Sequence, residues 1–243
     1  MPKLNNLRSD IATSKSIFIA IIIFKYINLL SGLVKPKKRK MLKKSYKILS
    51  VFAKNPGKEY LFEEIKKITK SKSESYTYNN LQFFVNENII KKEIKGGVSF
   101  YKALNSPKTI SYLSITAEHN AWQKKNLPLR IIQELTNLIK IKFYTLLITG
   151  SYANSKETKN SDLDIIIVVN SDPKKTIANL KQYCELSIPQ IHLHVFTAEE
   201  FKEMLLDKKS NYGKEAVKNN LIFNGAETYF KILLEATENG FSY

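Results

Sequence analysis

The sequence predicts an α/β (α+β) protein with a mainly helical first domain and a second domain in which strands alternate with helices. Three observations support this prediction. Apolar stripes of helical spacing and a Gly-Gly turn fill residues 41–105, and strand-like apolar runs begin at about residue 142. The intervening residues, 106–141, have a helical pattern. We therefore expect domains at 41–105 and 142–243, joined by a helical linker, with a helical C-terminus.

The composition is that of a globular and strongly basic chain. Of its 243 residues, 43% are hydrophobic, and the formal net charge is +17. Such an excess predicts a polyanionic partner, which is nucleic acid, nucleotide phosphate or an anionic membrane surface; the lysine-rich composition of AT-rich genomes is the alternative explanation. The single cysteine, Cys184, excludes an internal disulfide framework and suits a reducing cytoplasm. With three histidines, a Cys/His zinc site is disfavoured.

Residues 1–40 form an apolar and basic segment of open role. Apolar residues dominate 17–34, which is near the minimum length of a membrane helix, and basic residues follow between 35 and 40. Lys25 lies at the centre of this span, where a charge is costly. The segment is a membrane anchor, an amphipathic or packed helix, or an extension without a role. The extension is favoured and membrane contact is not.

Residues 41–105 are expected to form three helices and a hairpin. Helical apolar stripes occupy 42–53, 61–68 and 76–88, and the first stops at the Pro-Gly pair after residue 55. Two extended segments flank Gly96-Gly97 and predict a hairpin. Three helices closed by a hairpin resemble the winged helix-turn-helix family.

The winged-helix resemblance implies that the third helix enters the major groove of DNA. Hydroxyl and amide groups on that helix can read base edges, and nearby lysines can contact phosphates. A module for protein contacts or dimerisation is the alternative, and the local basicity favours nucleic acid. The candidate DNA-binding residues are Lys66, Lys67, Lys70, Lys72, Tyr76, Asn79, Asn80, Lys91, Lys92 and Lys95.

Two linking helices are expected between residues 106 and 140, because Pro107 suits a first helical turn and Pro128 interrupts the pattern. From Phe143 the pattern changes. The apolar runs 143–149, 164–169 and 188–196 predict strands, whereas 173–184 and 198–208 predict helices. Helices are also expected from residue 212, with a stop at 222–225 and a last helix at about 226–238. This order is typical of an α/β domain with covered sheet faces.

Two aspartates mark the start of the second predicted strand. Asp162 and Asp164 are two residues apart, so a strand directs both carboxylates to one face. Like charges at this spacing repel unless a cation lies between them, and Mg²⁺ prefers one or two carboxylates with water and phosphate oxygens. Gly150 and Ser151 end the preceding strand, where a glycine permits close approach of a phosphate and a serine hydroxyl can donate to it.

These residues resemble a family signature. The run from Ile148 to Ser151, ten further residues and then Asp162-Leu163-Asp164-Ile165 is similar to the motif of the polymerase-beta-type nucleotidyltransferase superfamily. Gly-Ser-Tyr-Ala at 150–153 and Ser161 match its minimal, prokaryotic members. The resemblance covers about residues 142–200. It implies a mixed sheet, NTP bound by Gly150, Ser151 and Ser161, and two divalent ions, Mg²⁺ or Mn²⁺, held by Asp162 and Asp164.

The third expected carboxylate is missing from this pattern. Active members place it on the next strand, where this chain has His192, with His194 on the same face. An imidazole can act as a base or bind metal, although it is a poorer Mg²⁺ ligand than a carboxylate. A histidine-modified active enzyme, a nucleotide-binding domain with weakened catalysis and histidines without a role remain open. We include His192 with Asp162 and Asp164 among the candidate catalytic residues.

Two functions follow from the resemblance. The leading one is a magnesium-dependent nucleotidyltransferase that transfers a nucleoside monophosphate to a protein, RNA or small-molecule acceptor. Minimal members are often paired with small helical toxins, which implies an antitoxin role with a cognate toxin as partner. The alternative is a DNA-binding transcriptional regulator whose nucleotidyltransferase domain senses NTP without turnover.

Overall fold

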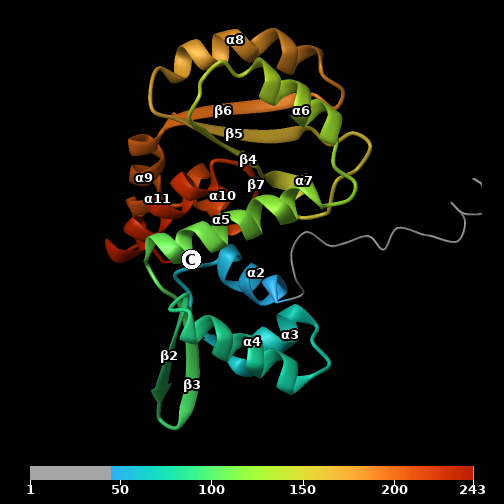
Figure 1. The fold of residues 1–243 in the computed structure, drawn as a ribbon. Coiled ribbons are helices and arrows are strands. Elements are labelled where there is room, and N and C mark those ends of the chain that lie inside the picture. The colour runs from blue at the N-terminus through green and yellow to red at the C-terminus, as the bar shows by residue number, and fades with distance from the viewer. Residues whose placement is uncertain (1–44, 243) are drawn as a thin grey trace, which may run out of the picture. The chain divides into compact units, whose positions relative to one another are not determined.

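The structure is a computed structural model that describes residues 45–242 (Figure 1). The segment 1–40, for which the sequence left three interpretations open, lies outside these residues. Among the helices between residues 45 and 242, none is long and apolar enough to cross a membrane.

Residues 45–103, called the N-terminal module below, contain three helices and a small sheet. The helices are α2 (Tyr46–Lys54), α3 (Phe62–Thr69) and α4 (Glu74–Asn86), and the strands are β1 (Tyr60–Leu61), β2 (Ile90–Lys95) and β3 (Val98–Ala103). The strands are antiparallel in the order β1-β3-β2. Gly96 and Gly97 form the turn of the β2–β3 hairpin with positive φ angles, where the sequence predicted it. The pattern gave no indication of β1.

Local caps set the ends of the helices in this module. The Ser73 side chain accepts a hydrogen bond from the backbone N–H of Tyr76 at 3.1 Å, so α4 begins at Glu74. The side chain of Glu64 accepts one from the backbone N–H of Leu61 at 2.8 Å at the start of α3. Lys70 ends α3 with a φ of 51°, and its backbone N–H bonds back to the carbonyl of Lys66.

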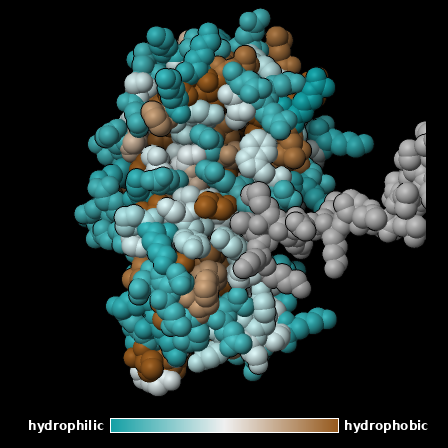
Figure 2. Space-filling view, in the orientation of Figure 1, coloured by the Kyte–Doolittle hydropathy of each residue, from teal (hydrophilic) through white to brown (hydrophobic). Residues whose placement is uncertain are grey.

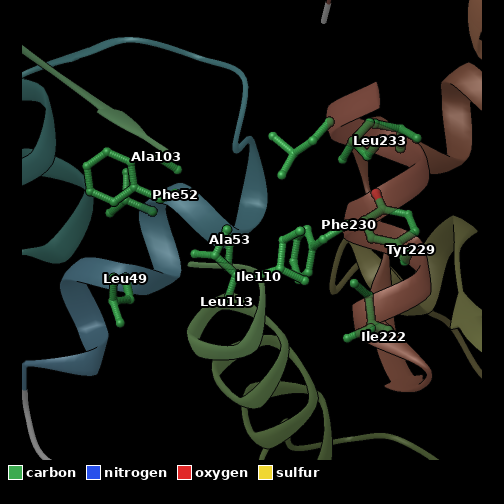
Figure 3. Close-up of a cluster of buried hydrophobic side chains, with 14 of the residues drawn as sticks. Leu49, Phe52, Ala53, Ala103, Ile110, Leu113, Ile222, Tyr229, Phe230 and Leu233 are labelled. Atoms are coloured by element: carbon green, nitrogen blue, oxygen red, sulfur yellow. The ribbon is translucent and has the colours of Figure 1, made fainter. Parts of the chain in front are cut away.

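The two predicted linking helices are present as α5 (Pro107–Trp122) and α6 (Leu129–Leu138). Helix α5 is more than a spacer, because its buried Ile110 and Leu113 belong to one hydrophobic cluster with residues of α2 and α11 (Ala226–Glu238) (Figure 3). Figure 3 shows Ile110 and Leu113 of α5 between Ala53 of α2 and Phe230 of α11. The N-terminal module and the C-terminal helix are thus held to the same central helix.

The second half of the chain is built on a mixed four-stranded sheet in the order β6-β5-β4-β7. The strands are β4 (Tyr144–Ile148), β5 (Leu163–Val169), β6 (Ile191–Thr197) and β7 (Leu221–Asn224). Strands β5 and β6 run parallel, whereas β4 is antiparallel to both of its neighbours. The mixed sheet implied by the resemblance is therefore confirmed, and the described fold is of the predicted α/β class.

Strand β7 corrects one prediction. Residues 222–225 were expected to be a stop between helices, but Ile222 pairs with Leu147 of β4. Ile222 and Phe223 are both buried, one on each side of the sheet. A strand of four residues is too short for its alternating pattern to be separated from a helix end in the sequence.

Helices cover both faces of this sheet (Figure 1). Alternate residues of β4 and β5 enter two separate hydrophobic clusters, as shown by Leu147 in one cluster and Leu146 and Ile148 in the other. Helices α9 (Ala198–Leu206) and α11 pack on the first face, and α6 and α8 (Pro173–Leu186) pack on the second. Cys184 of α8 is buried, which raises the pKa of its thiol to about 11 and keeps it protonated at neutral pH.

A side chain of α5 caps the last helix. Gly225 precedes α11 with a φ of 69°, and the backbone N–H of Ala226 donates to the carboxylate of Glu118 at 2.9 Å. Glu118→Ala is expected to lower the free energy of unfolding by about 1 kcal/mol, because it removes this cap and a negative charge near the helix N-terminus. Glu118→Gln keeps an acceptor oxygen and is expected to lose less. Urea denaturation measures both, and equal stability of all three proteins would contradict this account.

Candidate active site

The candidate site lies where β4 ends and β5 begins. Helix α7 (Gly150–Ala153) follows β4 directly, and the backbone N–H of Thr149 donates to the carbonyl of Asp164 at 3.0 Å. Gly150 has a φ of 65°, and a Cβ atom placed there would lie 2.0 Å from Oδ2 of Asp164. The sequence suggested that this glycine admits a phosphate. The geometry adds a second requirement, since any other residue would collide with the Asp164 carboxylate.

Asp162 and Asp164 lie on either side of buried Leu163 at the start of β5. Their side chains are 45% and 30% exposed, so both carboxylates reach solvent. The His192 side chain contacts both carboxylates. The two acids therefore face the same side of the strand, as their spacing predicted. The two acids therefore form one open cluster beside the Gly150 turn.

His192 lies on the neighbouring strand β6. It pairs with Asp164 in the parallel β5–β6 register, the place at which the sequence located the missing third carboxylate. Its Nε2 lies 3.5 Å from Oδ2 of Asp162, and its Nδ1 lies 3.6 Å from Oδ1 of Asp164. The imidazole is 51% exposed and stands between the two acids on one side and solvent on the other. His194, two residues further on β6, has its ring centroid 4.4 Å from that of Tyr212.

Tyr212 is a site residue that the sequence did not indicate. It opens α10 (Tyr212–Lys218), and its hydroxyl lies 3.3 Å from Oγ1 of Thr149. Burial raises the pKa of the phenol, the nearby Asp164 carboxylate raises it further, and the Thr149 hydrogen bond opposes both effects. Tyr212 therefore stays protonated at neutral pH and lies close to Asp164. Helical spacing alone could not show that α10 folds back to the Gly150 turn.

Ser151 and Ser161, the other predicted nucleotide-binding residues, border the loop between α7 and β5. Ser161 Oγ accepts a hydrogen bond from the backbone N–H of Thr158 at 2.9 Å and lies 3.2 Å from the Thr158 hydroxyl. Ser161 thereby closes a short turn just before Asp162. Ser151 is half-buried in the first turn of α7, beside Gly150.

The carboxylates can serve as part of a cation site. Within residues 45–242, no three His, Cys, Asp or Glu side chains are arranged to hold a metal ion by themselves. Mg²⁺ does not require such a cage, because it commonly takes one or two carboxylates and completes its shell with water and substrate phosphates. The donor chemistry of Asp162 and Asp164 fits that requirement. A neutral imidazole adds little to it.

The predicted DNA-binding residues are spread over the N-terminal module, and the structure places several of them in internal contacts. Lys66 forms ion pairs with Glu63 and Glu74, and Lys91 and Lys95 form them with Glu93. Asn80 donates to the carbonyl of Tyr76 at 2.7 Å. In the described part of the chain, no carboxylate pairs with four of the predicted lysines: Lys67, Lys70, Lys72 and Lys92.

The tip of the β2–β3 hairpin has an apolar as well as a basic surface. Ile94 and Val98 beside the glycine turn are exposed, and Figure 2 shows the brown patch that they form at the end of the hairpin. Exposed Tyr76 and Asn79 lie on α4. The structure thus leaves Tyr76 and Asn79, two of the predicted DNA-binding residues, accessible, and it pairs Lys66, Lys91 and Lys95 with carboxylates.

Comparison with known families finds a match within the second half of the chain. Residues 130–223 match the family model of the nucleotidyltransferase domain. The match runs from α6 to β7 and includes Gly150, both aspartates and His192. It supports the transfer of a group from an NTP as the general activity of this region. Comparison with curated proteins gives no match.

Proposed function

We propose that this protein is a magnesium-dependent nucleotidyltransferase that moves a nucleoside monophosphate from NTP to an acceptor hydroxyl. The observation that carries the proposal is the position of the Asp162–Asp164 pair against the left-handed Gly150, at the end of the sheet. The nucleotidyltransferase match over residues 130–223 supports it.

Each part of the site has a role in this proposal. The backbone at Gly150 and the hydroxyl of Ser151 receive the triphosphate, and Ser161 holds the loop that leads to Asp162. Asp162 and Asp164 would hold Mg²⁺ or Mn²⁺. When bound, the divalent ions lower the pKa of the acceptor hydroxyl and neutralise charge on the pyrophosphate leaving group. Most of the rate comes from alignment of the two reactants and from charge neutralisation.

His192 can act as the base that accepts the proton of the acceptor hydroxyl in this reaction. The acceptor oxygen forms a bond to the α-phosphorus, the bond from that phosphorus to the pyrophosphate oxygen breaks, and the acceptor proton must leave. The His192 imidazole lies beside both carboxylates and is half exposed, so a ring nitrogen can accept that proton. The Tyr212 hydroxyl, which lies 3.3 Å from Oγ1 of Thr149, joins the start of α10 to the end of β4.

The acceptor is proposed only by its chemical class, a molecule with a free hydroxyl group. A protein, an RNA or a small molecule with a free hydroxyl can accept the nucleotide, and a cognate toxin is the protein acceptor suggested by the resemblance to minimal members. The three helices and hairpin of the N-terminal module fit a winged helix, which would hold nucleic acid near the site. Lys67, Lys70, Lys72 and Lys92 are its available phosphate contacts.

Labelled nucleotides test the proposed reaction. The full chain is incubated with Mg²⁺ and each of the four NTPs, labelled at either the α- or the γ-phosphorus, together with candidate acceptors. Transfer of the α-label and release of the γ-label as pyrophosphate is the expected result. Transfer of the γ-label to an acceptor would show a phosphotransferase and overturn the proposal.

A DNA-binding regulator that senses NTP is the second candidate, and His192 favours it. With a histidine in place of the third acid, the described residues offer two carboxylates and no complete metal cluster. This candidate predicts NTP binding without transfer of either label to any acceptor, and DNA affinity that changes when NTP is added.

A further inference from the structure

A groove lined by lysines runs along the N-terminal module toward the Gly150 turn. It consists of two pockets of about 470 and 230 Å³ that share Ser50 and Lys54. The larger pocket lies between α2 and the end of α3. The smaller one is bounded by α2, α5, the end of α7 and the residues that precede β7. These two pockets together are called the lysine groove.

The positive charge of the lysine groove is concentrated in the larger pocket, and Lys54 lines both pockets. Lys47, Lys54, Lys58 and Lys70 line the larger pocket, and no aspartate or glutamate lines either one. Lys58 forms an ion pair with Glu64, with its Nζ 3.4 Å from Oε1. Within residues 45–242, no carboxylate lies at ion-pair distance from the other three. Lys47, Lys54 and Lys70, which have no ion-pair partner among the described residues, create a field that attracts an anion.

The smaller pocket connects this charge to the candidate active site. It reaches Ala153, the last residue of the helix that begins at Gly150. It also reaches Asn219 and Asn220, which precede Leu221, the β7 partner of Ile148 at the end of β4. Ala153 belongs to the same short helix as Gly150, so this end of the groove lies about one helical turn from the Gly150 turn.

Lys124 continues the positive charge at that border. Its Nζ donates to the carbonyl of Ala153 at 2.6 Å. Burial lowers the pKa of this ammonium, Glu157 opposes the effect, and the like charge of Lys54 lowers it further. Lys124 therefore places a positive charge at the end of α7, beside Ala153.

The spacing of the lysines indicates the size of the anion. Lys47 and Lys54 are seven residues apart on one helix, which separates them by about 10 Å along the axis. Their side chains can therefore contact successive phosphates of one chain, which fits a ligand that carries several phosphates in a row. The larger pocket also exposes Ile68, an apolar surface for a base. Pockets of this volume admit one strand and its bases rather than a duplex.

We propose that the lysine groove binds the phosphodiester backbone of a single-stranded nucleic acid whose terminal hydroxyl is the acceptor of the transferred nucleotide. The strand would lie on Lys47, Lys54 and Lys70 and run past Ala153 and Asn219 to the Gly150 turn. This inference rests on the proposed function for the transfer itself, whereas strand binding is independent of catalysis. It selects nucleic acid over a protein toxin as the acceptor.

Strand binding by the full chain tests the inference without any turnover. Fluorescence anisotropy measures the affinity for labelled single-stranded RNA and DNA oligonucleotides of equal length over a series of salt concentrations. The comparison is between wild type, Lys47→Ala/Lys54→Ala and a matched control, Lys174→Ala/Lys175→Ala. The control removes the same charge from exposed positions on α8, at the other side of the molecule in Figure 1. Circular dichroism checks that each variant is folded.

The groove variant is expected to bind strands at least tenfold more weakly. Its slope of log affinity against log salt should be less steep by about 1.4, since each single-strand phosphate contact contributes about 0.7. Lys47→Arg/Lys54→Arg should restore binding, and the α8 control should change neither quantity. The difference between the RNA and DNA affinities shows whether the protein also contacts the ribose 2′-hydroxyl. Equal losses in the groove and α8 variants, or wild-type binding by the groove variant, would overturn the inference.

Strand binding and label transfer, measured on the same variants, distinguish a failure of the groove inference from a failure of the proposed catalysis. Asp162→Asn/Asp164→Asn should retain strand binding while losing transfer. If strands bind through the groove and no label is ever transferred, the groove remains and the proposed catalysis fails. If labels transfer to a protein alone and the groove variant transfers at the wild-type rate, the catalytic proposal remains and the groove inference fails.

Discussion

Replacement of both Asp162 and Asp164 by asparagine is expected to lower nucleotidyl transfer by about 10³-fold or more. Asparagine preserves shape but removes the two negative charges that make this cluster a cation site. Loss of metal-assisted charge stabilisation is worth several kcal/mol, and about 4 kcal/mol corresponds to a factor of 10³. Both side chains are partly exposed, so the fold should tolerate the change. Initial rates of α-label transfer at saturating NTP measure the effect.

The control for the aspartate pair is Glu199→Gln, which neutralises an exposed carboxylate in the first turn of α9, just after β6. This variant is expected to transfer label at the wild-type rate. A similar fall in both variants would show that general charge, and not the Asp162–Asp164 cluster, supports the reaction. An unchanged rate in the double variant would remove the cluster from the mechanism.

Gly150→Ala is the second change with a large expected effect. A methyl group at this position would lie 2.0 Å from Oδ2 of Asp164, so the carboxylate must move. A displacement of about 1 Å at a reacting centre can cost about 10²-fold in rate, and we expect a loss of transfer of that size. The left-handed φ of 65° adds a cost of about 1–2 kcal/mol in stability.

Gly96→Ala separates the two consequences of the Gly150 substitution. Gly96 has a φ of 57°, but nothing lies within 4 Å of a Cβ built there. This variant is expected to lose similar stability in thermal denaturation while it transfers nucleotide normally. Loss of activity in both variants would attribute the Gly150 effect to general destabilisation. Full activity in Gly150→Ala would show that Asp164 does not need its observed position.

The signature region could be predicted because its chemistry is local. Gly150-Ser151 and the Asp162–Asp164 pair are close in sequence, and strand periodicity alone directs both acids to one face. Counting along the next strand also placed His192 at the position that faces the two aspartates, and the β5–β6 register pairs it with Asp164. The roles of these residues in binding and catalysis remain predictions until the variants are measured.

Other parts of the site depend on contacts that are distant in sequence. Tyr212 reaches Thr149 across 63 residues, and β7 joins β4 through pairs such as Ile222 with Leu147. Nothing in the local pattern of either segment encodes its partner. The ion pair between Lys66 and Glu74 likewise removes a predicted phosphate contact only after the helices have folded together.

The most direct test of the central claim is calorimetric titration of NTP into wild type and Asp162→Asn/Asp164→Asn, with and without Mg²⁺. The claim is that the Gly150 turn and the two aspartates form one nucleotide site. We predict that wild type binds NTP in a magnesium-dependent manner, that the double variant loses this dependence, and that Lys47→Ala/Lys54→Ala retains it. Equal, magnesium-independent binding by wild type and the aspartate variant would place the nucleotide elsewhere and contradict the claim.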